Sequence, residues 1–143
     1  MIGYVQLLCH LLGDYILQND WMALNKKQKG FVGLSAIVIH AALYSASFAI
    51  AWAIGLAPNL QIVPALALIF VSHFVIDRWN IPIWITQLKN FNFAKKVWAE
   101  GKPGKANTLF IGRPAYIGVW LSIIVDNTLH LIINFAIIAL LSR

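Results

Sequence analysis

Charged residues are scarce in this sequence, and acidic ones are the scarcest. Only 11% of the 143 residues are Asp, Glu, Lys or Arg, and five acidic residues face eleven basic ones. Soluble domains carry about twice this charged fraction, so an ordinary soluble domain is a poor interpretation. The single cysteine, Cys9, excludes a disulfide within the chain, and its apolar neighbours favour a small buried side chain over a reactive thiol.

Hydrophobic residues are correspondingly abundant. They make up 60% of the chain, and the mean hydropathy is +0.74. Four apolar stretches are long enough to cross a hydrocarbon core at about 1.5 Å per helical residue. The sequence therefore predicts an all-α integral membrane four-helix bundle that forms a single transmembrane domain over residues 1–143. The expected spans are residues 1–19, 31–56, 60–79 and 115–141.

The first stretch lacks the basic start of a cleavable signal, and polar residues interrupt it, so we expect it to stay in the mature protein. The net charge is +6, yet the basic residues gather after the first and third stretches, and the turn at 57–61 has none. The positive-inside rule then places both basic loops in the cytoplasm and both termini outside. We expect the lipid bilayer as a partner and no nucleic acid.

The cytoplasmic segment 81–113 differs from the four spans. Its larger apolar residues fall roughly on one face of a helix, which predicts an interfacial helix between the third and fourth spans. The residues of this face are Trp84, Ile85, Leu88, Phe91 and Trp98.

Polar side chains recur at steps of four inside the expected spans, and this spacing places them on one face of a helix. Burying ionisable groups in a bilayer costs several kcal/mol each unless they pair or bind an ion. Seven of the nine Asp, Glu and His residues nevertheless lie in the spans, namely His10, Asp14, His40, His73, Asp77, Asp126 and His130.

A His and an Asp four residues apart on a helix can present two ligands to one metal ion. Three such pairs on three spans predict one or two divalent metal ions near the cytoplasmic face. Nitrogen and oxygen ligands suit zinc, our first choice, and also Mn or Fe(II). The predicted ligands are His10, Asp14, His73, Asp77, Asp126 and His130. The predicted catalytic groups are Asp14 and His40, with His40 as a ligand or a base.

Amide and hydroxyl side chains in the same stripes are candidates for orienting ligands or substrate, and helix packing explains each of them equally well. These residues are Gln6, Gln18, Ser122, Asn127 and Asn134. At the expected cytoplasmic mouth, four basic residues are candidates for binding an anionic head group, namely Arg78 and Arg113 above all, with Lys26 and Lys27. Membrane topology alone explains these four residues equally well.

Four motifs resemble one known family over nearly the whole chain. They are HLLGDYILQNDWMALNKK, IHAALY, SHFVIDRW and DNTLH, which begin at residues 10, 39, 72 and 126. They resemble domain-of-unknown-function family 3307, a group of small bacterial and phage membrane proteins, and this implies a place in the bacterial inner membrane. The resemblance implies that the family's polar positions are His10, Asp14, Gln18, His40, His73, Asp77, Asp126 and His130.

The chain departs from the family pattern at two points. Trp79 and Asn80 stand where a Lys is expected after the third motif's Asp, so no phosphate role is assigned there. Asn127 stands where a Gln is expected after the fourth motif's Asp, which keeps the amide.

A looser similarity is to inner-membrane proteins described as metal-dependent hydrolases. The sequence therefore predicts a membrane-embedded hydrolase that acts on a lipid or another membrane-associated small ester or phosphoester. Two alternatives stay open. One is a metal-ion or proton permease, which would require a homo-oligomer because four helices form a thin pore. The other is a non-enzymatic membrane interaction protein of host or phage origin.

Overall fold

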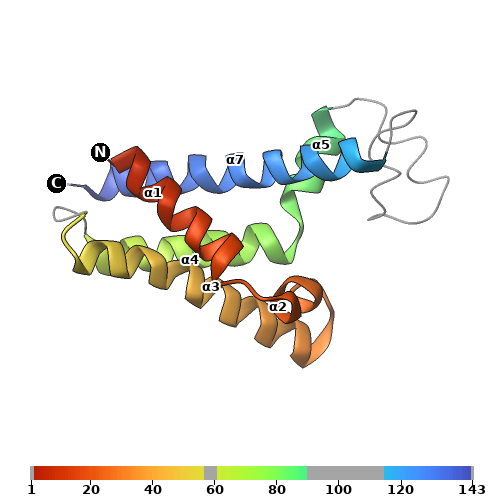
Figure 1. Ribbon diagram of the computed structural model, residues 1–143, viewed down its shortest axis with the longest axis horizontal. Coiled ribbons are helices and arrows are strands. Elements are labelled where there is room, and N and C mark those ends of the chain that lie inside the picture. The colour runs from red at the N-terminus through yellow and green to blue at the C-terminus, as the bar shows by residue number, and fades with distance from the viewer. Residues whose placement is uncertain (1, 57–60, 90–114, 143) are drawn as a thin grey trace. The chain divides into compact units, whose positions relative to one another are not determined.

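The computed structural model describes residues 2–56, 61–89 and 115–142, and every element in these ranges is a helix (Figure 1). The predicted all-α class is confirmed. The chain forms two compact units, residues 1–79 with 130–143 and residues 80–129. The elements in chain order are α1 (Ile2–Leu11), the π-helix η1 (Leu12–Ile16), α2 (Asp20–Asn25), α3 (Gly30–Ala53), α4 (Ile62–Arg78), α5 (Ile81–Lys89) and α7 (Ala115–Leu141).

Helix α3 is central to the first unit, because α1, η1, α2 and α4 all pack against it. It ends at Ala53, and two residues later Gly55 has a φ of +81°, a conformation that favours glycine. The Gly55 and Leu56 amides donate to the carbonyls of Trp52 and Ala51, as in a Schellman motif. The hydrophobic core of this unit consists of Cys9, Tyr44, Phe48, Ala51, Ala65, Ile69, Ile137 and Ile138.

Within residues 2–56, 61–89 and 115–142, two helices are long and apolar enough to cross a membrane, namely α3 and the Val119–Leu141 part of α7. The first expected span is shorter, because α1 and η1 contain ten and five residues and together extend about 22 Å. The chain then turns into α2, where the Asn19 side chain accepts a hydrogen bond from the Met22 amide. Helix α4 has 17 residues. Both segments fall below the ~20 residues of a typical span, so the four-span bundle is supported only in part.

In the second unit, α5 begins where the interfacial helix was expected, with Pro82 in its first turn, where proline is well tolerated. Three residues of its predicted apolar face, Trp84, Ile85 and Leu88, are exposed. Phe91 and Trp98 lie outside the described residues. The structure therefore shows a short helix at the start of segment 81–113.

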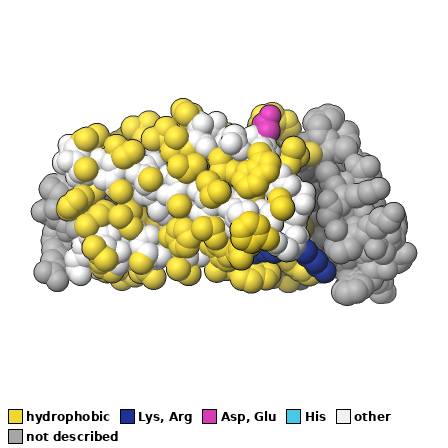
Figure 2. Space-filling view, turned by 90° about the horizontal axis from the view of Figure 1, so that it is seen from below, with side chains coloured by type: hydrophobic (Ala, Val, Ile, Leu, Met, Phe, Trp, Pro, Cys, Tyr) yellow, Lys and Arg dark blue, Asp and Glu magenta, His cyan; other side chains and the backbone are white. Residues whose placement is uncertain are grey.

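Large hydrophobic side chains cover much of the face seen in Figure 2. In the first unit the exposed ones include Phe31, Ile50, Val63, Phe135 and Leu140, from α3, α4 and α7. Soluble monomers rarely expose large contiguous apolar patches. A surface of this kind is suited to contact with lipid.

Candidate metal centre

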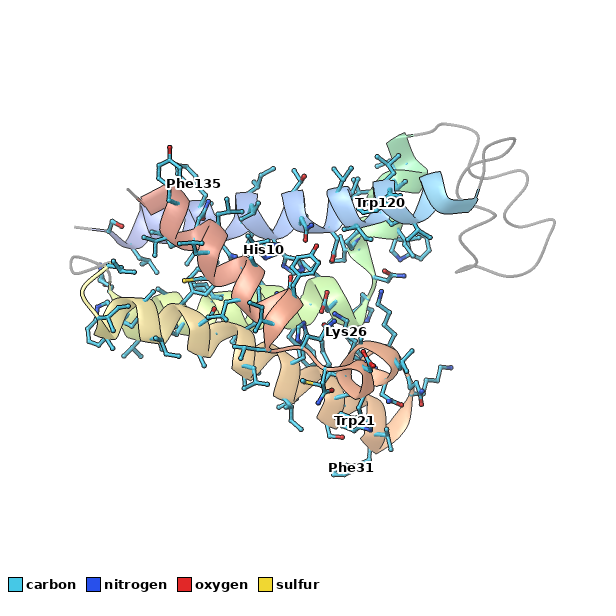
Figure 3. All side chains as sticks on the ribbon, viewed as in Figure 1. His10, Trp21, Lys26, Phe31, Trp120 and Phe135 are labelled. Carbon is cyan, nitrogen blue, oxygen red and sulfur yellow. The ribbon has the colours of Figure 1, made fainter. Side chains whose placement is uncertain are left out.

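Four histidines and two aspartates converge inside the first unit. Each helix that lines the site supplies one or two of them, and all are buried except Asp14, whose side chain is 13% exposed. His10, marked in Figure 3, comes from α1. The others are Asp14 from η1, His40 from α3, His73 and Asp77 from α4, and His130 from α7.

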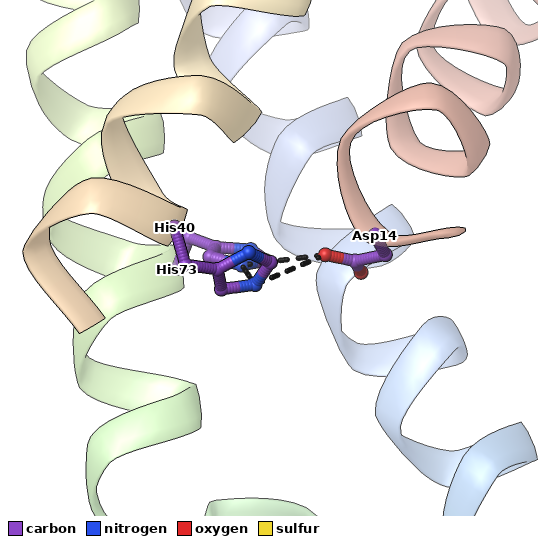
Figure 4. Close-up of side chains that lie close together, drawn as sticks. All are labelled: Asp14, His40 and His73. Carbon is purple, nitrogen blue, oxygen red and sulfur yellow. Dashed lines mark hydrogen bonds and ion pairs between the residues drawn. The ribbon is translucent and has the colours of Figure 1, made fainter. Parts of the chain in front are cut away.

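Asp14, His40 and His73, here called the Asp14 group, form a close triangle (Figure 4). The two Nε2 atoms of the histidines are 2.8 Å apart, and each is 3.4 Å from Asp14 Oδ1. Ligands at about 2.0–2.1 Å from a tetrahedral zinc ion would lie about 3.3 Å from one another. These three atoms therefore have nearly the mutual spacing of ligands around one ion, and the group could hold a metal.

His73, Asp77 and His130, here called the Asp77 group, form a second cluster whose ligand atoms lie within 4.8 Å of one another. Asp77 Oδ1 is 3.5 Å from His130 Nε2, and Asp77 Oδ2 is 3.5 Å from His73 Nε2. His73 belongs to both groups. Because a neutral imidazole has one nitrogen able to accept, His73 Nε2 can serve only one ion at a time. The two groups are overlapping sites rather than independent ones.

The two aspartates differ in their cationic partners. Asp77 Oδ2 lies 2.6 Å from Nζ of Lys26, the residue that follows α2 (Figure 3). Among the described residues, the ion-pair partners of Asp14 are the imidazoles of His10, His40 and His73. Its Oδ1 atom is buried, and the imidazole nitrogens of His40 and His73 lie 3.4 Å from it, farther than in a short charged hydrogen bond. Since a buried carboxylate is costly unless it is well paired, a cation beside Asp14 would lower that cost.

Two residues of helix α4 hold Lys26, one by its side chain and the other by its main chain. Asp77 contacts the ammonium, and Nη1 of Arg78 donates to the main-chain carbonyls of Lys26 at 3.2 Å and Gln28 at 2.5 Å. Gly33 allows this loop to lie close to α3, because a Cβ there would collide with the Gln28 carbonyl. Arg78 thus fixes the loop that carries Lys26, and its predicted head-group role stays a prediction.

Tyr44 lies between several of the histidines and is fully buried. Its hydroxyl accepts a hydrogen bond from Asn134 Nδ2 at 2.6 Å and is 2.8 Å from His10 Nδ1. Its ring stacks on His73, with centroids 3.7 Å apart and an interplanar angle of 20°. These contacts fix the orientation of His10 and His73, so Tyr44 supports the site without being a ligand.

The other predicted residues have varied positions. His10 Nδ1 is 3.3 Å from Asp14 Oδ2, so His10 can orient the Asp14 carboxylate, although it belongs to neither group. Gln18 accepts a hydrogen bond from Lys26, and Gln6 is buried. Ser122, Asp126 and Asn127 are on the part of α7 that belongs to the second unit, and Arg113 lies outside the described residues.

Sequence reasoning did not place Lys26 beside the metal ligands, and it gave Tyr44 no role. Lys26 was a candidate for binding an anionic head group, which membrane topology explained equally well. Tyr44 follows His40 by four residues and therefore faces the same side of α3. That spacing, extended from ionisable residues to tyrosine, would have found it.

The clustered residues span the chain from the first helix to the last, and one family model covers the same range. A model described as "Protein of unknown function (DUF3307)" matches residues 2–143. The chain belongs to the DUF3307 family. The resemblance drawn from the four motifs is thereby confirmed. No curated protein and no solved structure matches the chain. DUF3307 membership carries no activity, so a function must be argued from the site itself.

Proposed function

We propose that this DUF3307 protein is an integral membrane protein that binds a divalent metal ion through the Asp14 group and hydrolyses a membrane-associated ester or phosphoester. The spacing of Asp14 Oδ1 and the two Nε2 atoms carries this proposal. Zinc is our first choice, since two imidazoles and one carboxylate are a common catalytic zinc set, and Mn or Fe(II) also suit these ligands.

The number of ligands in the Asp14 group supports hydrolysis over a purely structural role. Structural zinc sites have four protein ligands, whereas catalytic sites have three and leave one position for water or substrate. A divalent ion in such a site supplies an activated water for attack on an ester or phosphoester. His10 would orient Asp14, and Tyr44 would hold the ring of His73 in place.

The apolar surface supports the membrane part of the proposal. In the part of the chain that the structure describes, two helices have the length and composition of membrane spans, and Phe31 and Phe135 are among the large side chains exposed on α3 and α7. The predicted orientation, with basic loops in the cytoplasm and both termini outside, follows from the lysines that precede α3. A place in the bacterial inner membrane follows from the family resemblance.

The overlap of the two groups at His73 favours one alternative, a metal-ion or proton permease. Adjacent cation positions that share a ligand are suited to passing an ion from one to the next. This alternative requires flux across the bilayer. Proteoliposomes loaded with a metal-sensitive or pH-sensitive dye would detect it, and flux without hydrolysis would replace the enzyme proposal.

Metal analysis of the detergent-purified protein tests the shared requirement of both functions. We expect one bound metal ion in the wild type, and a rise in melting temperature when metal is added after chelation. Asp14→Asn should weaken metal binding roughly tenfold to a hundredfold or more, because it removes the anionic ligand. Asp20→Asn, an exposed acidic residue, is the matched control.

Two results would contradict the proposal. The first is a wild-type protein with no stoichiometric metal and no thermal shift with Zn, Mn or Fe(II). The second is equal loss of metal in Asp14→Asn and Asp20→Asn. If metal binds, turnover of a generic phosphoester by wild type but not by Asp14→Asn would support the enzyme.

A further inference from the structure

The ammonium of Lys26 lies beside the Asp14 group and contacts one of its three ligands, His40. Nζ is 2.6 Å from Asp77 Oδ2, 2.8 Å from Gln18 Oε1 and 3.4 Å from His40 Nε2. An ammonium has three N–H donors and accepts no hydrogen bond. The Lys26 side chain is only 13% exposed, so this arrangement is built into the unit rather than formed at its surface.

Metal binding at His40 would remove one contact of this ammonium. The Nε2 atom of His40 lies 2.8 Å from His73 Nε2, 3.1 Å from Asp77 Oδ2 and 3.4 Å from Lys26 Nζ, and a metal ion bound to its single lone pair would exclude a hydrogen bond from Lys26. A metal ion in the Asp14 group would therefore leave one Lys26 N–H without an acceptor. Asp77 and Gln18 would still hold the ammonium beside the Asp14 group, and its third N–H would be available to a ligand of the metal ion.

The charge balance of the metal-occupied site also favours binding of an anion. Asp14 and Asp77 contribute two negative charges, and Lys26 contributes one positive charge. A divalent ion would bring the total to +1 with neutral imidazoles, and protonation of any imidazole would raise it further. A net charge in a buried site is costly, so the occupied site should attract an anion.

We propose that Lys26 and the open metal position together bind a phosphate group, and that the substrate is therefore a phosphoester rather than an uncharged ester. This inference rests on the proposed metal site and narrows its substrate class. Lysine binds phosphate as a point charge, and a phosphate offers one oxygen to the metal and another to the ammonium. A phosphoester is both anionic and hydrolysable, whereas an uncharged ester would leave the positive charge unbalanced.

Cobalt-loaded protein provides a test that does not depend on activity. Co²⁺ in a site with nitrogen and oxygen ligands absorbs visible light, and the spectrum changes when an anion enters the open position. We expect inorganic phosphate to change the wild-type spectrum. Lys26→Met should keep Co²⁺ but weaken phosphate binding roughly tenfold or more, as expected for loss of a charged hydrogen bond.

Two further variants control this experiment. Lys26→Arg keeps the positive charge and should retain much of the phosphate affinity, and this separates a charge effect from misfolding of Lys26→Met. Lys29→Met removes an exposed lysine of the same loop and should bind phosphate like the wild type.

A further experiment tests whether the bound phosphate group belongs to a lipid head group or to a free phosphate ion. A short-chain phosphatidic acid in mixed micelles is compared with inorganic phosphate, and the corresponding diacylglycerol is the uncharged control. Tighter binding of phosphatidic acid would assign the site to a lipid head group, and equal binding would assign it to phosphate alone. Both results support the proposal.

The proposed function and this inference fail in different ways. Absence of a Co²⁺ spectrum in the wild type would overturn the metal site itself. A normal Co²⁺ spectrum that neither phosphate nor phosphatidic acid changes would overturn the anion site alone. Equal phosphate affinity in wild type and Lys26→Met would also overturn it.

Discussion

The hydroxyl of Tyr44 connects three helices of the first unit at a single buried point. It accepts from Asn134 on α7 and contacts His10 on α1, while Tyr44 itself belongs to α3. Buried hydrogen bonds contribute little net stability when formed, but a buried polar group that loses its partner costs considerably more. The hydroxyl should therefore matter more for stability than for metal affinity.

Replacing Tyr44 with Phe tests this expectation. The ring and its stacking on His73 are kept, while Asn134 Nδ2 loses its acceptor and His10 loses its hydroxyl contact. We expect the free energy of unfolding to fall by about 1–3 kcal/mol, measured by denaturation in mixed micelles, with metal affinity changed much less. Tyr4→Phe is the matched control, since Tyr4 is 78% exposed, and it should change stability by about 0.5 kcal/mol or less. Equal effects of the two substitutions would contradict this role of Tyr44.

At the residue scale, spacing predicted the ligands but not the groups that surround them. Asp14, His40 and His73 were found because ionisable residues in apolar helices are costly and therefore conspicuous. Lys26 was not placed beside these ligands, because it lies in a loop where basic residues are expected. Only the fold shows that its side chain reaches Asp77 on a helix 51 residues later in the chain.

At the scale of elements, the π-helix η1 is the main departure from the predicted pattern. A regular helix was expected over residues 1–19, but the Leu17 amide donates to the Leu12 carbonyl, five residues earlier. π-Helical turns are rare and occur frequently at functional sites, and this one carries Asp14. Apolar periodicity could not predict it, because a single wider turn scarcely changes the pattern.

Gly13 allows η1 to lie close to α3. Substitution of Gly13 tests whether stability and metal binding depend on this close packing. A Cβ at Gly13 would lie 2.5 Å from Tyr44 Cδ2 and 3.1 Å from Tyr44 Cα, closer than packed atoms allow. Gly13→Ala should therefore lower the free energy of unfolding by about 1–3 kcal/mol. It should also weaken metal binding, because Asp14 is the next residue.

Gly3→Ala is the control on the preceding helix, where nothing lies within 4 Å of the added Cβ. This change should be neutral or stabilise the helix by up to about 1 kcal/mol. Thermal unfolding with and without metal measures both variants. A Gly13→Ala protein with wild-type stability and wild-type metal affinity would show that η1 need not lie against α3.

At the scale of the whole molecule, composition predicted the helical class and the apolar surface. It could not predict helix lengths, because an apolar run does not reveal where a helix ends. The first expected span ends early because Asn19 caps a new helix, and α4 begins only at Ile62. Hydropathy averages over such local signals, so the helices are shorter than expected in three of the four spans and match the expected length in the fourth.

The predicted orientation can be tested with the single natural cysteine in place. Cys9 is buried, so a membrane-impermeant maleimide should react with it slowly. Lys29→Cys and Ser142→Cys introduce thiols before α3 and after α7, in regions predicted to lie on opposite sides of the membrane. In sealed inner-membrane vesicles of known orientation, we expect the Lys29→Cys protein to react only from the cytoplasmic side and the Ser142→Cys protein only from the other. Reaction of both thiols from one side would contradict the predicted orientation.

The contacts of Lys26 with Asp77 and Arg78 also affect how the chain folds during its synthesis. The loop at residues 26–28 is fastened by groups that the ribosome adds about fifty residues later. At ~5–20 residues per second, the loop would wait roughly 3–10 s for α4 to be synthesised. During that interval the Lys26 ammonium lacks the carboxylate that later balances it. The N-terminal half can therefore reach its native conformation only after α4 has been synthesised and has packed against it.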